Sequence, residues 1–138
     1  MSLQRGVARS GVAQDAMSTA IVLFRSNDLR LVDHEPLHAA HAGFARVLHV
    51  YCFDPRWWGT SRVSGLPRMS ALRCKFLLEG VDSLRASLRA RGAELVLRSG
   101  ATEAVVPALA RAVGASAVLA HTDVHVEEAA ADAALRGA

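Results

Sequence analysis

Four short apolar runs alternate with helical patterns along this chain. The first, Thr19–Arg25, is continuous and rich in β-branched residues, which is typical of a strand buried on both faces. Three later runs also predict strands: Arg46–Phe53, Ala93–Arg98 and Ala115–His121. Strands that alternate with helices predict a parallel sheet with helices on both faces. The expected fold is therefore doubly wound α/β, with the strands in the order 3-2-1-4 as numbered along the chain.

Capping residues and apolar side chains spaced three and four apart predict the helices. The expected helices cover residues 34–42, 67–91, 103–113 and 127–135. Asp33 or His34 can cap the first helix, and Pro36 is tolerated in its first turn. The longest helix has one apolar face, formed by Leu72, Phe76, Leu77, Val81, Leu84 and Leu88.

Ligands in such a sheet bind beyond the carboxyl ends of the strands, where the strand order reverses. The expected crevice lies between the strands that end at Arg25 and His121. Arg25, Asp28 and Arg30 follow the first strand and have two interpretations. They could contact an anion or a chromophore, or an Arg–Asp pair could order the loop. The second interpretation is favoured.

Composition limits the class of protein. A chain of 138 residues, 51% of them hydrophobic, is enough for one domain with a core. The net charge of +3 is weak evidence for nucleic-acid binding, and a soluble arginine-rich protein is the favoured interpretation. No apolar run approaches the ~20 residues of a membrane span. Cys52 and Cys74 suit buried free thiols in a reducing compartment such as the cytoplasm.

Residues 1–18 lack the periodicity of the rest of the chain. They predict a disordered leader or tag, followed by one domain at residues 19–138. The leader could be the end of a transit peptide, which would place the protein in a plastid or mitochondrion. The favoured interpretation is a leader from a vector or an upstream start, with Met17 as the natural start, because no amphipathic arginine face is evident.

Residues 34–38 read HEPLH and match the zinc-protease pattern HExxH. That chemistry needs both histidines on one helical face. Because Pro36 stands at the helix start, His34 lies at or before the cap and cannot share a face with His38. We therefore predict no metal site. The sequence also contains no glycine-rich phosphate pattern and no nucleophile–histidine triad, so no catalytic residue is predicted.

Three segments carry a resemblance to one family: Ile21–Asp33, Val50–Arg56 and Gly65–Glu79. The first, IVLFRSNDLRLVD, resembles the opening strand and loop of the photolyase/cryptochrome family, although Leu23 replaces the usual tryptophan and one extra residue follows Arg25. The other two, VYCFDPR and GLPRMSALRCKFLLE, resemble the DASH cryptochrome branch. The segments occur in the family's order and at about its spacing. The resemblance implies the small α/β domain with which members of that family begin.

The resemblance also implies a chromophore site. The implied cofactor-binding residues are Phe24, Arg25, Cys52, Phe53, Asp54, Arg56, His121 and Asp123. The Asp123 carboxylate could accept two parallel N–H bonds from a pterin, or it could cap the last helix. Trp57 and Trp58 could provide a flat partner for a ring, or they could pack against the missing helical domain or this domain's own edge. For the two tryptophans the packing interpretation is favoured.

The function implied by the resemblance is that of an antenna domain in a blue-light flavoprotein, a DASH cryptochrome or DNA photolyase. In that family a helical domain, for which this chain has no room, holds FAD and performs the photochemistry. FAD and photorepair are therefore not expected of this chain, and methenyltetrahydrofolate is expected to bind weakly or not at all. Two alternatives stay open: a nucleotide-binding module of the universal-stress type, and an interaction domain without a chromophore.

Two partners are expected on the same grounds. One is the missing helical domain. The other is a second copy of the chain, because family members cover the fourth strand with a fifth and the run 115–121 has no lysine or proline to discourage pairing. Nucleic acid is expected only through the longer protein, and no membrane partner is expected.

Overall fold

A five-stranded parallel sheet forms the centre of the protein. The computed structural model describes residues 2–3, 18–61 and 63–122. The strands are β1 (Ser2–Leu3), β2 (Thr19–Phe24), β3 (Arg46–Phe53), β4 (Leu95–Ser99) and β5 (Ala115–Leu119). Their spatial order is β1-β5-β2-β3-β4. The four strands expected from the sequence therefore lie in the expected order 3-2-1-4.

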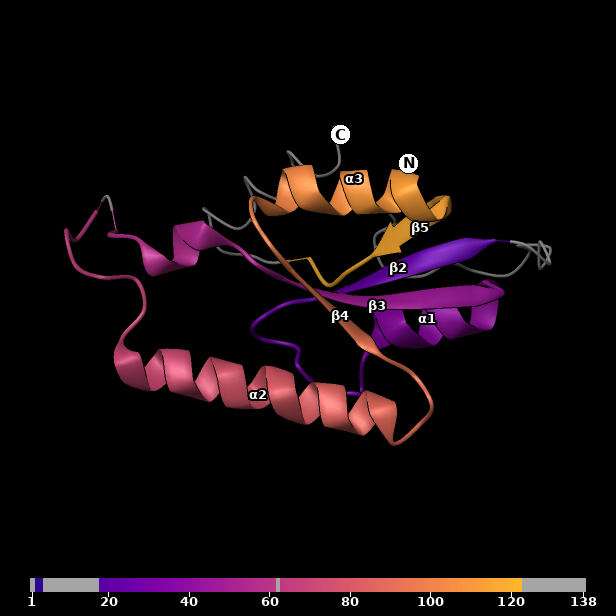
Figure 1. The fold of residues 1–138 in the computed structure, drawn as a ribbon, viewed down its shortest axis with the longest axis horizontal. Helices are drawn as coiled ribbons and strands as arrows, with labels where there is room; N and C mark the ends of the chain where they lie inside the picture. The colour runs from indigo at the N-terminus through magenta and orange to yellow at the C-terminus, as the bar shows by residue number, and fades with distance from the viewer. Residues whose placement is uncertain (1, 4–17, 62, 123–138) are drawn as a thin grey trace.

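Helices cover both faces of this sheet, as the alternating pattern predicts. Helices α1 (Glu35–Gly43) and α2 (Ala71–Arg89) pack on one face, and α3 (Thr102–Val113) packs on the other (Figure 1). A short 3-10 helix, η1 (Pro55–Trp58), follows β3. In the part of the chain that the structure describes, no helix is long and apolar enough to cross a membrane.

Strand β2 is the core of the sheet, because every one of its six residues is buried. Successive side chains of a strand point to opposite faces. Val22 and Phe24 accordingly join a core with α1 and α2, whereas Ile21 and Leu23 join a second core with α3. A strand with helices on both sides must be apolar at every position, which explains the unbroken run in the sequence.

Helix α2 departs from the sequence prediction at its amino end. It starts at Ala71 behind the capping residue Ser70, not at Pro67. Leu72 and Phe76, which we expected in the core, are 81% and 77% exposed. The cause is length: the 19 residues of α2 span ~28 Å, whereas the five residues of β4 span only ~17 Å. The first turns of α2 therefore extend past the sheet.

The outer edge of β5 also differs from the prediction. We expected this strand to be an edge of the sheet, but on its outer side Ala117 and Val118 pair in parallel with Ser2 and Leu3. Two residues of the expected leader thus occupy this edge, where backbone N–H and C=O groups need partners. A two-residue strand leaves no periodicity by which a sequence could predict it. The helix expected at 127–135 lies outside the described residues.

Candidate functional site

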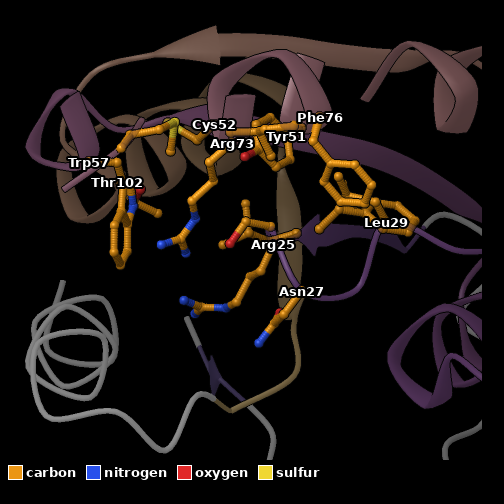
Figure 2. Close-up of a pocket in the computed structure, with 14 residues that line it drawn as sticks. Arg25, Asn27, Leu29, Tyr51, Cys52, Trp57, Arg73, Phe76 and Thr102 are labelled. Carbon is orange, nitrogen blue, oxygen red and sulfur yellow. The ribbon is translucent and has the colours of Figure 1, made fainter. Parts of the chain in front are cut away.

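A cavity of about 230 Å³ opens at the carboxyl ends of β2 and β3. The loop after β2, the helix η1, the exposed end of α2 and the start of α3 enclose it (Figure 2). Its lining consists of Leu23, Phe24, Arg25, Ser26, Asn27, Leu29, Tyr51, Cys52, Trp57, Met69, Arg73, Phe76, Leu77 and Thr102. Parallel α/β sheets bind their ligands at this end of the strands.

Aromatic rings and two arginines give the cavity its chemical character. Tyr51, Trp57 and Phe76 line it from three different elements, which offers flat apolar surface to a ring. Figure 2 shows the guanidinium groups of Arg25 and Arg73 reaching into the space between Trp57 and Asn27. No acidic side chain is among the described lining residues. The cavity is therefore suited to an aromatic ligand that carries negative charge.

The ionisable groups that β3 adds to the lining stay neutral. Burial raises the pKa of Tyr51 to about 12. Burial likewise raises the pKa of Cys52, whose thiol donates to the Gly100 carbonyl at 3.4 Å. A half-buried thiol that is protonated and hydrogen-bonded is a packing group and not a nucleophile. The two arginines thus carry the charge of the lining.

The structure brings only some of the predicted site residues together. Phe24, Arg25 and Cys52 line the cavity. Phe53 packs on the α1–α2 core, with its ring edge-on to Tyr51. Asp54, Arg56 and His121 belong to two polar clusters outside the lining. Asp123 lies outside the described residues, so its role stays a prediction.

The first polar cluster joins the end of β3 to the start of α3. Asp54, which is buried, accepts from the backbone N–H of Arg56 at 3.0 Å and from its Nε at 2.8 Å. It also accepts from the backbone N–H and the hydroxyl of Thr102, both at 3.1 Å. Arg56 in turn bridges to Glu103, with 2.7 Å between Nη2 and Oε2. Asp54 therefore caps α3 from a distant strand, because Ala101 at the cap position has no capping side chain.

The second polar cluster surrounds Asp28, where the sequence predicted a crevice. The Asp28 carboxylate is buried and accepts from the backbone N–H of Arg25 at 2.5 Å and from Nδ1 of His121 at 2.8 Å. His34 Nε2 lies 3.5 Å away. Burial alone would raise the pKa of Asp28, but its interactions with His34, Arg25 and His121 outweigh that effect and lower it. The position between the ends of β2 and β5 is thus filled by side chains.

The Asp28 cluster bears on one of the two interpretations of the Arg25 loop, that an Arg–Asp pair orders it. Asp28 does order the loop, but through the backbone N–H of Arg25 and not through a side-chain pair. The Arg25 side chain lines the cavity instead. Asp28 therefore orders the loop, whereas a contact of Arg25 with an anion or a chromophore stays a prediction.

Asp28, His34 and His121 are also the one group among the described residues whose atoms lie close enough to share a metal ion. The tautomer of His34 argues against such a site. His34 caps α1 because its Nδ1 accepts from the Leu37 N–H at 3.2 Å, so in the neutral ring Nε2 carries the proton. A protonated nitrogen cannot ligate a metal. His38, the other histidine of the HExxH match, is exposed on α1.

The sequence analysis missed several residues of the cavity. It placed Phe76 on the apolar face of the longest helix, and it named none of Arg73, Asn27, Tyr51 and Thr102 as site residues. The one usable signal was the spacing of Arg73 and Phe76, three apart on one helical face, together with the length of α2 relative to its neighbouring strand.

Comparison with known proteins gives a consistent family assignment. A sequence profile described as DNA photolyase matches residues 20–138. The blue-light photoreceptor PHR2 of Arabidopsis thaliana is 45% identical over 85% of this chain and 26% of its own length. Cryptochrome DASH of Gloeobacter violaceus is 44% identical over 88% of this chain and 24% of its own length. The chain thus spans about a quarter of these relatives.

Solved structures agree with these sequences. A Synechocystis cryptochrome has a TM-score of 0.80 at 37% identity, over 86% of this chain and 24% of that one. A Sulfolobus tokodaii photolyase, described as containing two FAD molecules and as implying a novel light-harvesting cofactor, has a TM-score of 0.75 at 26% identity. It covers 86% of this chain and 26% of that one.

The Asp54 cluster predicts a pH-dependent stability. Its hydrogen bonds lower the pKa of Asp54 from 3.8 to about 2, in spite of burial, so the ionised form stabilises the folded state. The contribution is complete above the unfolded pKa and is lost as pH falls through the folded one. Because Arg56 is 47% exposed, we expect it to be on the order of 1–2 kcal/mol.

Urea unfolding of the wild type and of Asp54→Asn would measure this contribution. The free energies of unfolding should differ by about 1–2 kcal/mol near pH 6, and the difference should shrink between pH 4 and pH 2. Asp82→Asn, at an exposed position on α2, controls for the loss of one negative charge. A difference for Asp54→Asn that is constant with pH would contradict an ionic role.

Proposed function

Because this chain belongs to the DNA photolyase family, we propose that it is a chromophore-binding antenna domain and that its cavity receives the chromophore ring. The observation that supports this most strongly is the combination of Tyr51, Trp57 and Phe76 around one opening at the carboxyl ends of the strands. Aromatic side chains prefer offset or edge-on contact with other rings, which suits the recognition of a planar heterocycle.

Methenyltetrahydrofolate is the chromophore we propose. Members of this family bind flavin and folate-type chromophores, and both consist of a planar ring with an anionic tail. The cavity volume of about 230 Å³ lies below the ~300–1,000 Å³ of typical ligand pockets, so it would hold a ring but leave a tail exposed. We therefore expect weak binding by the isolated domain. Asp123 remains the proposed acceptor for the pterin edge.

The proposed role contains no bond-breaking step. An antenna absorbs light and transfers the excitation to a second chromophore, which needs a fixed ring orientation but no catalytic group. The neutral thiol of Cys52 and the neutral phenol of Tyr51 agree with that role, because neither is an activated nucleophile or base. Flavin photochemistry, DNA binding and repair are proposed only for a longer protein that contains this domain.

The adjacent tryptophans offer a matched test of the proposed site. Trp57 lines the cavity, whereas Trp58 is 42% exposed and does not. In a titration with methenyltetrahydrofolate followed by chromophore absorbance, Trp57→Leu should weaken binding about tenfold, because ring contact and buried area are lost together. Trp58→Leu should change the affinity by less than about twofold. Equal effects of the two variants, or no binding by the wild type, would contradict the proposal.

The exposed start of α2 favours a second role, as an interaction surface. Leu72 and Phe76 lie four residues apart on one helical face and are mostly exposed. Neighbouring apolar side chains in solvent often mark a protein contact. We propose that this face of α2 packs against the flavin-binding helical domain of a longer protein, and that a second copy of the chain replaces that domain when it is absent.

Sedimentation velocity at micromolar concentration would test this interaction. The 138-residue wild type should self-associate, and Leu72→Gln should shift it toward the monomer because an apolar contact is lost. Val113→Gln is the matched control, because Val113 is also partly exposed but lies on α3, on the opposite face of the sheet. A monomeric wild type, or equal shifts in both variants, would show that the α2 face is not the interface.

A further inference from the structure

Two histidines meet between helix α1 and strand β3, away from the cavity. Nε2 of His41 and Nε2 of His49 are 3.1 Å apart. His41 lies in the last turn of α1 and His49 in the middle of β3, so the pair connects a helix to the sheet on which it packs (Figure 1). Neither residue lines the cavity. The proposed antenna role therefore leaves these two imidazoles without a task.

The two rings face each other through these nitrogens. Their centroids are 5.3 Å apart, and the ring planes are inclined by only 27°. Because the centroids are farther apart than the two Nε2 atoms, the nitrogens lie on the facing sides of the rings. Two imidazole ligands of one tetrahedral zinc ion, each at ~2.0–2.1 Å from the metal, have their nitrogens roughly 3.3 Å apart. The nitrogens of His41 and His49 are thus spaced as two ligands of one ion are.

The backbone of Glu94, directly before β4, fixes the tautomer of His49. Burial and the neighbouring His41 lower the pKa of this buried ring, whereas a hydrogen bond with the Glu94 backbone raises it. A bond that raises the pKa favours the protonated form, so the ring donates to the Glu94 carbonyl. Since Nε2 faces His41, the donor is Nδ1. Nε2 of the neutral ring then has a lone pair, and metal-binding histidines are oriented by the same kind of bond.

His41 supplies the adaptable half of the pair. It is exposed, so water can carry its ring proton from Nε2 to Nδ1 and leave a second lone pair beside the first. His34 differs, because its Nδ1 is occupied by the Leu37 N–H. Asp28, His34 and His121 are the one described group of three such side chains, but the pair has the tautomers that a metal needs. Solvent at His41 also gives water access to the remaining coordination positions.

We propose that His41 and His49 form a two-histidine site for a divalent transition-metal ion such as Zn²⁺, with water in the remaining coordination positions. Imidazole nitrogen suits Zn²⁺, Ni²⁺ and Cu²⁺, whereas Mg²⁺ and Ca²⁺ prefer oxygen ligands. Because the two ligands come from α1 and β3, a bound ion fastens the helix to the sheet and stabilises the folded state. The inference is independent of the proposed chromophore, since both histidines lie outside the cavity lining.

Calorimetric titration of the untagged 138-residue protein with Zn²⁺ tests the site. The wild type should bind Zn²⁺ and should not bind Mg²⁺ at the same concentration. His41→Gln should weaken Zn²⁺ binding at least about tenfold, because replacing even an outer partner of a metal ligand commonly costs about 10–100-fold. His38→Gln is the matched control, since it removes another exposed imidazole from α1. It should change the affinity by less than about twofold.

Urea unfolding with and without excess Zn²⁺ provides a second readout. The ion should raise the unfolding midpoint of the wild type and of His38→Gln, but not of His41→Gln, because only the first two retain both ligands. His49→Gln should also lose the effect; if this buried substitution prevents folding, the exposed position 41 decides alone. No Zn²⁺ binding by the wild type, or equal binding by the wild type and His41→Gln, would overturn the proposal. Loss of binding in His121→Gln instead would assign the ion to the Asp28 cluster and overturn it as well.

Discussion

The cavity opens at the carboxyl ends of the strands, and this end of the sheet depends on the burial of the Asp28 carboxylate. A carboxylate removed from water costs several kcal/mol unless donors surround it. Here the donors come from the end of β2 and from beyond the end of β5, and His34 at the start of α1 adds its electrostatic attraction. Satisfying one charge therefore joins three segments that are distant in sequence. The loop that forms one wall of the cavity has its course fixed by this carboxylate.

Asp54 has the corresponding role at the neighbouring strand. It follows β3 as Asp28 follows β2, and it holds η1 and the first turn of α3 together. Gly100 completes this junction: its φ of +137° suits glycine alone, and a Cβ there would come within 2.7 Å of the Val105 side chain. Two carboxylates at the ends of neighbouring strands thus fix the two sides of the cavity. The overhanging start of α2 adds Arg73 and Phe76.

The alternation of apolar runs predicted a parallel sheet with helices on both faces, because these features follow from burial and local periodicity. The strand order followed from the usual order of doubly wound sheets. The resemblance to photolyases and cryptochromes identified the family. The cavity was predicted only incompletely. The resemblance implied Phe24, Arg25 and Cys52, whereas Arg73 and Phe76 depend on how far α2 extends past the sheet. The length of α2 relative to β4 becomes visible only when the two elements pack together, so neither segment alone reveals it. The sequence likewise contains no local pattern that predicts the pairing of Ser2 and Leu3 with β5.

Amide hydrogen exchange at Arg25 tests most directly whether Asp28 holds together the segments at the carboxyl ends of the strands. The Arg25 N–H lies in a loop but donates to a buried carboxylate. This amide should therefore exchange as slowly as the amides of β2. Asp28→Asn should accelerate exchange at Arg25 by about tenfold or more, and should leave Val50 in β3 unchanged. An Arg25 amide that exchanges at the rate of an unstructured peptide in the wild type would contradict the account.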